Sequence, residues 1–135
     1  MRALLCVMAV TAVLVGGAAS ANGVRPPTFQ DLMTDSTLVV IGTVMTVEPR
    51  SAVGEGWATI HVERVLKGDH LEAISVATTS PVMELDPRCC VPGATYIMFL
   101  RPARPDSPLY RSVRGAYGVV WLGASPARSV AEVPR

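Results

Sequence analysis

Residues 37–47 read Thr-Leu-Val-Val-Ile-Gly-Thr-Val-Met-Thr-Val, and the pattern of this segment sets the architecture. β-Branched side chains are too frequent in it to favour a helix, so it predicts a strand that stops at Glu48-Pro49. Its nearly continuous apolarity indicates a strand covered on both faces. Gly42 lies where a strongly bent strand can need a residue without a side chain. We therefore expect the first strand of a curled sheet here.

Further strands follow along the chain. Ile60 and Val62 alternate within residues 57–67, and the apolar phase shifts over residues 63–66, which indicates a β-bulge. Other strands are predicted at residues 74–78, 96–100, 109–113 and 116–122, the last two separate or forming one strand broken at Gly115. Long loops are expected at residues 79–93 and at residues 101–108, whose prolines cannot pair inside a sheet because they lack an N–H.

A short helix is expected at about residues 28–36, just after Pro26-Pro27. Thr28 fits an N-cap, and Asp31 favours the positive end of the helix. This helix should lay Phe29, Leu32 and Met33 onto the core. One short N-terminal helix and five or six strands with closely spaced turn signals predict an all-β fold, a small barrel or sandwich.

The first 21 residues have the layout of a secretory signal peptide. Arg2 precedes an apolar run at residues 3–15, and small residues at 16–21 end in an A-x-A site, with cleavage expected after Ala21 or after Ser20. An uncleaved anchor needs about 20 apolar residues, more than this run contains. We therefore expect a secreted or periplasmic protein with no transmembrane segment after cleavage. The expected division is a signal peptide at 1–21, a linker at 22–27, the barrel domain at 28–122 and a flexible C-terminal tail at 123–135.

Composition argues against several classes of function. Twelve basic and 11 acidic residues give a net charge of +1, whereas proteins that bind nucleic acids usually have a clear basic excess. The sequence contains no phosphate-binding loop, G-x-S-x-G elbow or H-E-x-x-H motif. Nothing in it brings His61 or His70 close to a Cys or Ser nucleophile. We expect neither an enzyme, nor a cofactor, nor a nucleic-acid partner.

Cys89-Cys90 is the most unusual pair in the expected mature chain, and it is a candidate redox or disulfide site. Adjacent Cα atoms about 3.8 Å apart lie below the usual disulfide range. Three interpretations stay open: free thiols, a vicinal or intermolecular disulfide, and a metal site. A metal would need more ligands than this pair offers. His61-x-Glu63 and Glu84-x-Asp86 could contribute, but they also fit an exposed barrel wall and a solvated loop, and no metal is expected.

Three segments, at residues 37–44, 60–69 and 90–100, resemble exported bacterial domains with the OB-like barrel of tissue inhibitors of metalloproteinases and netrin modules. The resemblance covers about residues 29–122 and implies an OB-like β-barrel. In that family a cysteine before the fourth strand often pairs with one near the last strand, but Val113-Arg114-Gly115 contains none. The inhibitors bind their target's zinc through an N-terminal cysteine. The expected mature terminus, Asn22 or Ala21, lacks it.

OB-type barrels bind partners with a sheet face and the loops after strands one and four. The loop after the fourth expected strand is surrounded by arginines, and the loop after the first lies beside it. The candidate contact residues are Arg50, Trp57, Arg101, Arg104, Tyr110, Arg111 and Arg114, types that interfaces favour. Ordinary solvated arginines on a proline-stiffened hairpin would look the same. We expect a non-enzymatic binding domain for an extracytoplasmic protein or envelope component; the alternative is a protease-inhibitor-like protein that lacks the N-terminal cysteine mechanism.

Overall fold

The computed structural model describes residues 25–52 and 54–124. The expected signal peptide and residues 125–135 of the expected tail lie outside this range. The helical segments are α1 (Phe29–Asp35) and the short 3-10 helices η1 (Met83–Leu85) and η2 (Gly115–Gly118). The strands are β1 (Leu38–Glu48), β2 (Trp57–Lys67), β3 (Ala73–Ala77), β4 (Ala94–Pro102), β5 (Leu109–Ser112) and β6 (Val119–Ala124). None of the described helices is long and apolar enough to cross a bilayer.

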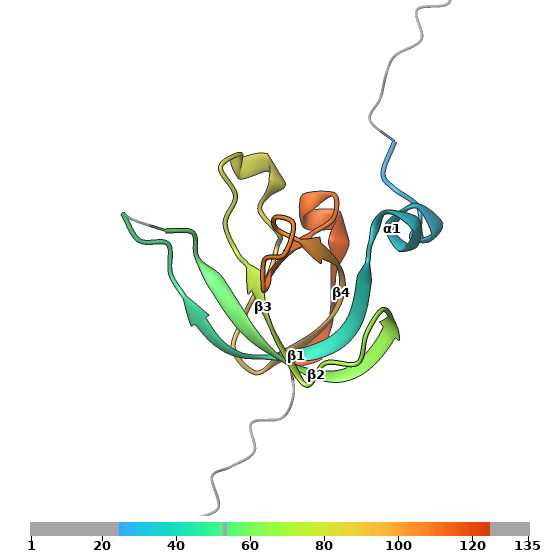
Figure 1. The fold of residues 1–135 in the computed structure, drawn as a ribbon, viewed down its shortest axis with the longest axis horizontal. Helices are drawn as coiled ribbons and strands as arrows, with labels where there is room; N and C mark the ends of the chain where they lie inside the picture. The colour runs from blue at the N-terminus through green and yellow to red at the C-terminus, as the bar shows by residue number, and fades with distance from the viewer. Residues whose placement is uncertain (1–24, 53, 125–135) are drawn as a thin grey trace, which may run out of the picture.

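Five of the strands close into a barrel (Figure 1). β1, β2 and β3 form an antiparallel meander, β3 pairs in parallel with β5, and β5 pairs with β4. Pairing of β1 with β4 closes the ring, and β6 adds to β4 outside it. This arrangement confirms the prediction of a small all-β, OB-like barrel with one short helix.

The hairpin of β1 and β2 carries the curl of the barrel. Its register shifts at three places, and two of these shifts place the extra residues Glu63 and Leu66 in β2, as the change of apolar phase predicted. A Cβ atom at Gly42 would lie 2.5 Å from Ile60 Cγ2 and 2.8 Å from the His61 carbonyl oxygen. β1 and β2 approach this closely because residue 42 has no side chain.

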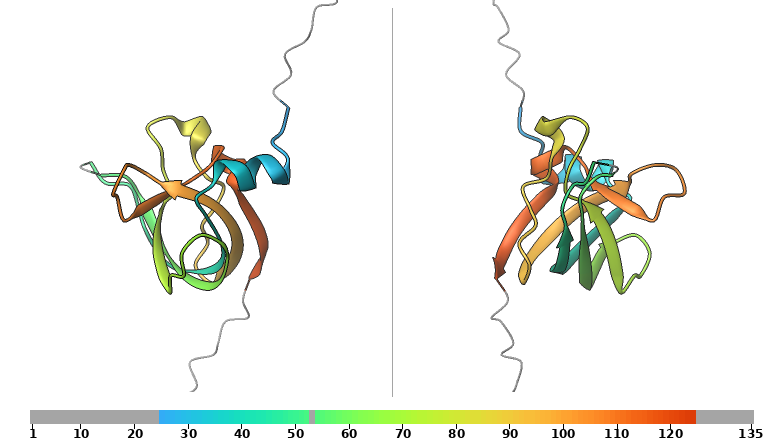
Figure 2. Two further views of the ribbon diagram at one scale, coloured as in Figure 1. Left: turned by 45° about the vertical axis from the view of Figure 1, so that its right-hand side comes forward. Right: turned by 90° about the vertical axis from the view of Figure 1, so that its left-hand side faces the viewer.

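The core has two parts, and they explain why β1 and β4 are apolar on both faces. The barrel interior holds the larger cluster, which includes Val40, Ile60, Val76, Met98 and Leu100. The smaller cluster lies under α1, outside the barrel wall, and consists of Leu32, Val39, Phe99 and Val113 with Met33 and Ile97 against it. Figure 2 shows α1 lying outside the barrel.

Helix α1 begins at a capping box formed by Thr28 and Asp31. Asp31 N–H donates to Thr28 Oγ1, while Thr28 N–H and Oγ1 donate to the Asp31 carboxylate at 2.8 Å, forming a capping box. These two hydrogen bonds, first that from the backbone N–H, hold the pKa of Asp31 below its ordinary value. Leu32 is buried and Met33 half-buried, as expected, but Phe29 is 62% exposed, with its ring in an edge-to-face contact with the core residue Phe99.

Several element boundaries differ from the sequence predictions. β4 continues through Arg101 to Pro102, which lies opposite Tyr110, because its position at the end of the hairpin requires no N–H from the proline. Thr78 lies outside β3. β5 and β6 are separate strands with η2 between them, one of the two expected arrangements. β6 runs two residues past the expected end of the domain at Leu122, because Thr95 and Ala94 pair with Gly123 and Ala124.

Candidate functional site

The loop after β1, residues 49–52 and 54–56, and the segment after β3, residues 78–79, lie together, and Arg111 of β5 contacts both. We call these two segments, together with the 103–108 hairpin loop that precedes β5, the loop end. Arg111 Nη2 donates to both carboxylate oxygens of Glu55, at 2.9 and 2.8 Å, and Arg111 Nη1 donates to the Thr79 carbonyl oxygen at 3.5 Å. Both side chains of the Glu55–Arg111 pair are largely shielded from solvent. The pair therefore ties the β1–β2 loop to β5.

Gly56 holds the segment after β3, residues 78–79, against the loop after β1. Its N–H donates to Thr79 Oγ1 and its carbonyl accepts from Thr78 N–H, both at 2.9 Å. A Cβ at this position would lie 2.8 Å from Thr78 Oγ1 and 3.0 Å from the backbone nitrogen of Arg50. The segment after β3 and the loop after β1 thus share backbone contacts that leave little freedom to either.

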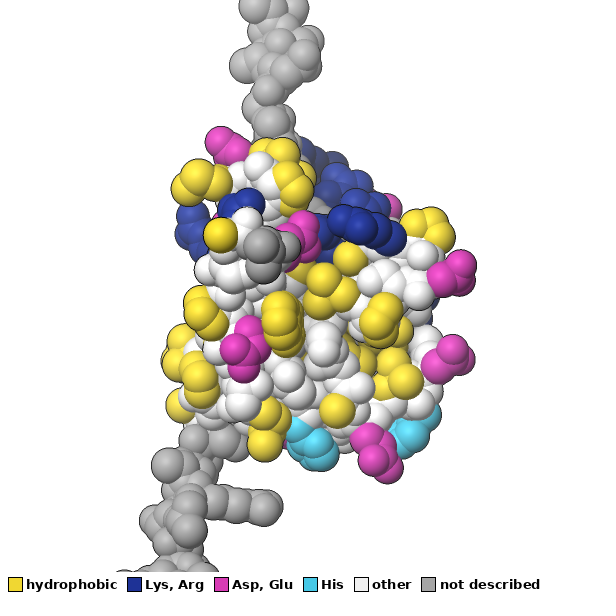
Figure 3. All heavy atoms as spheres, turned by 60° about the vertical axis from the view of Figure 1, so that its left-hand side comes forward, with side chains coloured by type: hydrophobic (Ala, Val, Ile, Leu, Met, Phe, Trp, Pro, Cys, Tyr) yellow, Lys and Arg dark blue, Asp and Glu magenta, His cyan; other side chains and the backbone are white. Residues whose placement is uncertain are grey.

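The candidate arginines differ in exposure and in the partners of their guanidinium groups. Arg101 and Arg111 are direct cross-strand partners on β4 and β5. Within residues 25–52 and 54–124, the exposed side chains of Arg50, Arg101 and Arg104 form no hydrogen bond or ion pair, in contrast to Arg111. Figure 3 shows Lys and Arg side chains gathered toward the top of one face, with hydrophobic side chains spread below them.

Arg114 does not share the contacts of Arg111. Its Nε donates to Asp35 Oδ2 of α1 at 2.8 Å, and its Nη2 lies 2.7 Å from the same oxygen in an ion pair. Its backbone is left-handed with φ 55°. The guanidinium of Arg114 is therefore engaged by the helix, and that of Arg111 by the β1–β2 loop.

An open cavity of about 340 Å³ lies where β2, β3 and the start of β5 come together. Its lining consists of Thr59, Leu71, Ala73, Ile74, Ser75, Pro108 and Tyr110. The parallel pairing of β3 with β5 has only two register pairs, Ser75 with Leu109 and Val76 with Tyr110, so the wall is least tightly closed here. The site combines apolar atoms with the hydroxyls of Thr59, Ser75 and Tyr110.

Sequence reasoning found only part of this cavity. Tyr110 was among the candidates, and it is half-buried against the barrel core as well as lining the cavity. Trp57 is exposed two residues before Thr59, on the same face of β2. Thr59 and Ser75 were missed, although both are small polar residues facing outward between buried neighbours. Their alignment across β2 and β3 depends on a register that only the folded sheet defines.

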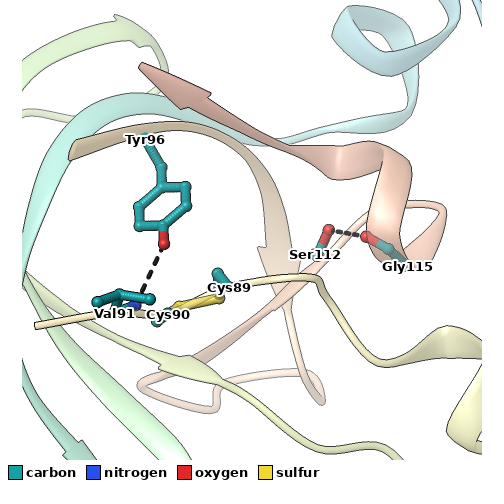
Figure 4. Close-up of a disulfide and its surroundings, with 6 residues drawn as sticks. All are labelled: Cys89, Cys90, Val91, Tyr96, Ser112 and Gly115. Carbon is teal, nitrogen blue, oxygen red and sulfur yellow. Dashed lines mark hydrogen bonds between the residues drawn. A yellow bond between two sulfur atoms is a disulfide. The ribbon is translucent and has the colours of Figure 1, made fainter. Parts of the chain in front are cut away.

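Cys89 and Cys90 form a vicinal disulfide (Figure 4). This is one of the interpretations that the sequence left open, beside free thiols, an intermolecular disulfide and a metal site. The peptide bond between the two residues is cis. Both half-buried side chains pack against the barrel core. Beside them, Val91 N–H donates to the hydroxyl of the buried Tyr96 at 3.2 Å, and Gly93 N–H donates to the Val44 carbonyl at 2.8 Å. The disulfide segment is thus held to the barrel by β1 and β4.

Two of the three candidate metal-ligating carboxylates accept hydrogen bonds from the chain. Glu63 accepts a hydrogen bond from Thr43 Oγ1, and Asp86 accepts one from Ser80 N–H. His61 is exposed on the barrel wall. Among the described residues, no three His, Cys, Asp or Glu side chains are grouped so that they could hold a metal ion.

No protein-family model matches this chain, and a search of curated proteins found no match.

Proposed function

We propose that this protein is an exported, non-enzymatic binding domain of the netrin-like OB type, which contacts an extracytoplasmic protein or envelope component through its loop end and the adjoining cavity. Export follows from the pattern of residues 1–21, and the family from the three resembling segments. The alternative is a protease-inhibitor-like protein that acts without the N-terminal cysteine mechanism, because the expected mature terminus is Asn22 or Ala21.

The observation that carries the proposal is the open cavity beside a loop end whose conformation is already fixed. The bidentate Glu55–Arg111 pair and the two hydrogen bonds of Gly56 hold the loop after β1 and the segment after β3 before any partner arrives. Less conformational entropy is then lost on binding. The cavity, large enough for one or two side chains, lies on the β2–β3 side, where OB barrels hold their ligands.

Arg101 and Arg104 are the best-placed residues for the electrostatic part of such a contact. Both are exposed, and neither has a partner among the described residues, so their guanidinium groups can pair with a carboxylate or phosphate of another molecule. Arg111 has a different role in this proposal, because its ion pair with Glu55 positions the loop.

The test is capture of partners from the native envelope fraction and culture medium by the immobilised protein, followed by affinity measurement on the species recovered. The double variant R101E/R104E should weaken binding at least tenfold, and S75F, which fills the cavity, should do the same. Arg64 provides the matched control, because it is exposed toward the far end of β2.

Melting curves of the arginine variants should stay close to that of the parent, since exposed charges contribute little to folding. A cooperative melt of S75F shows that this variant is folded. If R101E/R104E and S75F bind as the parent does while R64E loses binding, the contact surface lies on the barrel wall. Recovery of no specific partner from either fraction would also overturn the proposal.

A further inference from the structure

Strand β6 forms an uncovered edge of the sheet. It stands at the end of the strand order, and β4 is its one partner strand among the described residues. A Cβ built at Gly123 would meet nothing within 4 Å, so the space beside this residue of β6 is open. The outer N–H and C=O groups of such an edge are available to another strand.

Both faces of β6 expose large apolar side chains. Trp121 is 65% exposed, Leu122 50% and Val120 44%. Trp121 lies opposite Tyr96, whose side chain belongs to the barrel core, and Val120 lies opposite Ile97, which packs on the α1 side. Since paired residues share a face, Trp121 and Val120 project to opposite sides of the sheet.

This edge carries neither a charged residue nor a proline, two features that often keep edge strands from pairing with other chains. Its sequence is Val-Val-Trp-Leu-Gly-Ala. A register shift places Leu122 as an extra residue in β6, so the regular part of the edge is residues 119–121. A short, apolar and charge-free edge is suited to a partner strand of the same character.

We propose that β6 is a dimerisation strand, which pairs antiparallel with β6 of a second copy of this chain. A twofold axis brings the same surface of both copies together. The β6 strand of each copy then covers Trp121 and Val120 of the other copy. A net charge of +1 creates little repulsion between copies. The proposal does not depend on the proposed function, because β6 pairs with residues 94–98 of β4 and leaves the 103–108 hairpin free.

The amount of apolar surface indicates a weak dimer. With an aromatic side chain contributing 150–250 Å², the exposed parts of the three side chains amount to roughly 300 Å² per copy. Two copies then bury on the order of 600 Å² before the backbone edges are counted, less than a specific stable interface buries, so the contact is weak and transient. The dimer should therefore dissociate on dilution through the micromolar range.

Sedimentation equilibrium of the purified protein between about 1 and 300 µM tests this inference, because weak interfaces dissociate in this range. We expect a monomer–dimer equilibrium that is weakened at least tenfold by W121K and by L122E. W57K is the matched control, since it places the same charge on another exposed tryptophan, on β2. It should leave the equilibrium unchanged.

Thermal melts of dilute samples establish that each variant is folded. A parent protein that is monomeric over the whole range would overturn the inference. So would a dimer that persists in both W121K and L122E, because it would then use another surface.

Discussion

At the scale of single residues, Lys67 shows how a barrel strand completes a helix. Its Nζ donates to the carbonyl oxygens of Met33 and Ser36, both at 2.6 Å. The last turn of α1 contains no basic residue of its own, and the carbonyls at a helix C-terminus lack partners and carry partial negative charge. The last residue of β2 therefore supplies the cation that the helix lacks.

Lys67→Met should lower the free energy of unfolding by about 1–3 kcal/mol, because two charge-assisted hydrogen bonds are lost while most of the aliphatic stem is kept. Urea unfolding followed by circular dichroism measures the change. Arg64→Met, on the same strand, should stay within about 0.5 kcal/mol, as exposed substitutions usually do. Equal stability of the two variants would show that Lys67 does not hold the helix.

At the scale of elements, the β1–β2 hairpin depends on close contact at one point. Gly42→Ala should destabilise the protein by about 1–3 kcal/mol, because the new methyl group meets Ile60 and the backbone of His61 and forces the strands apart. Denaturant melts should detect this loss. Gly54→Ala is the control, since its Cβ would meet only Ser51 Oγ, at 3.8 Å. An unchanged melt for Gly42→Ala would contradict this, because β1 and β2 could then move apart at residue 42 without loss of stability.

At the scale of the whole molecule, the barrel is closed by the pairing of β1 with β4 and does not depend on the disulfide. β1 and β4 join residues that lie far apart in sequence, whereas the Cys89–Cys90 bond joins neighbours and so removes almost no chain entropy from the unfolded state. The double variant C89S/C90S should keep one cooperative melt and lose about 1–2 kcal/mol through changed packing against the core. Calorimetry with and without reductant measures this, and a broad, non-cooperative transition would contradict it.

The sequence by itself determined the features that depend on neighbouring residues. The β-branched run of β1, the bounds of β2, its bulge and the Thr28–Asp31 cap follow from side-chain periodicity and from hydrogen bonds within a few residues. The barrel was predictable because several short strands with apolar cover on both faces have few other ways to bury that surface. These properties need no knowledge of which distant segments meet.

Only the tertiary structure decided what depends on long-range register. Four arginines around one loop look alike in sequence, yet Arg111 pairs with Glu55, Arg114 pairs with Asp35, and Arg101 and Arg104 stay exposed. The cavity forms where β3 and β5, more than 30 positions apart, pair over two residues. Phe29, in the first turn of α1, stays 62% exposed although Leu32 on the same helix is buried, and the packing of the helix on the barrel decides this difference. Chain proximity sets local conformation, but the packing of distant strands selects the side chains that remain free to bind.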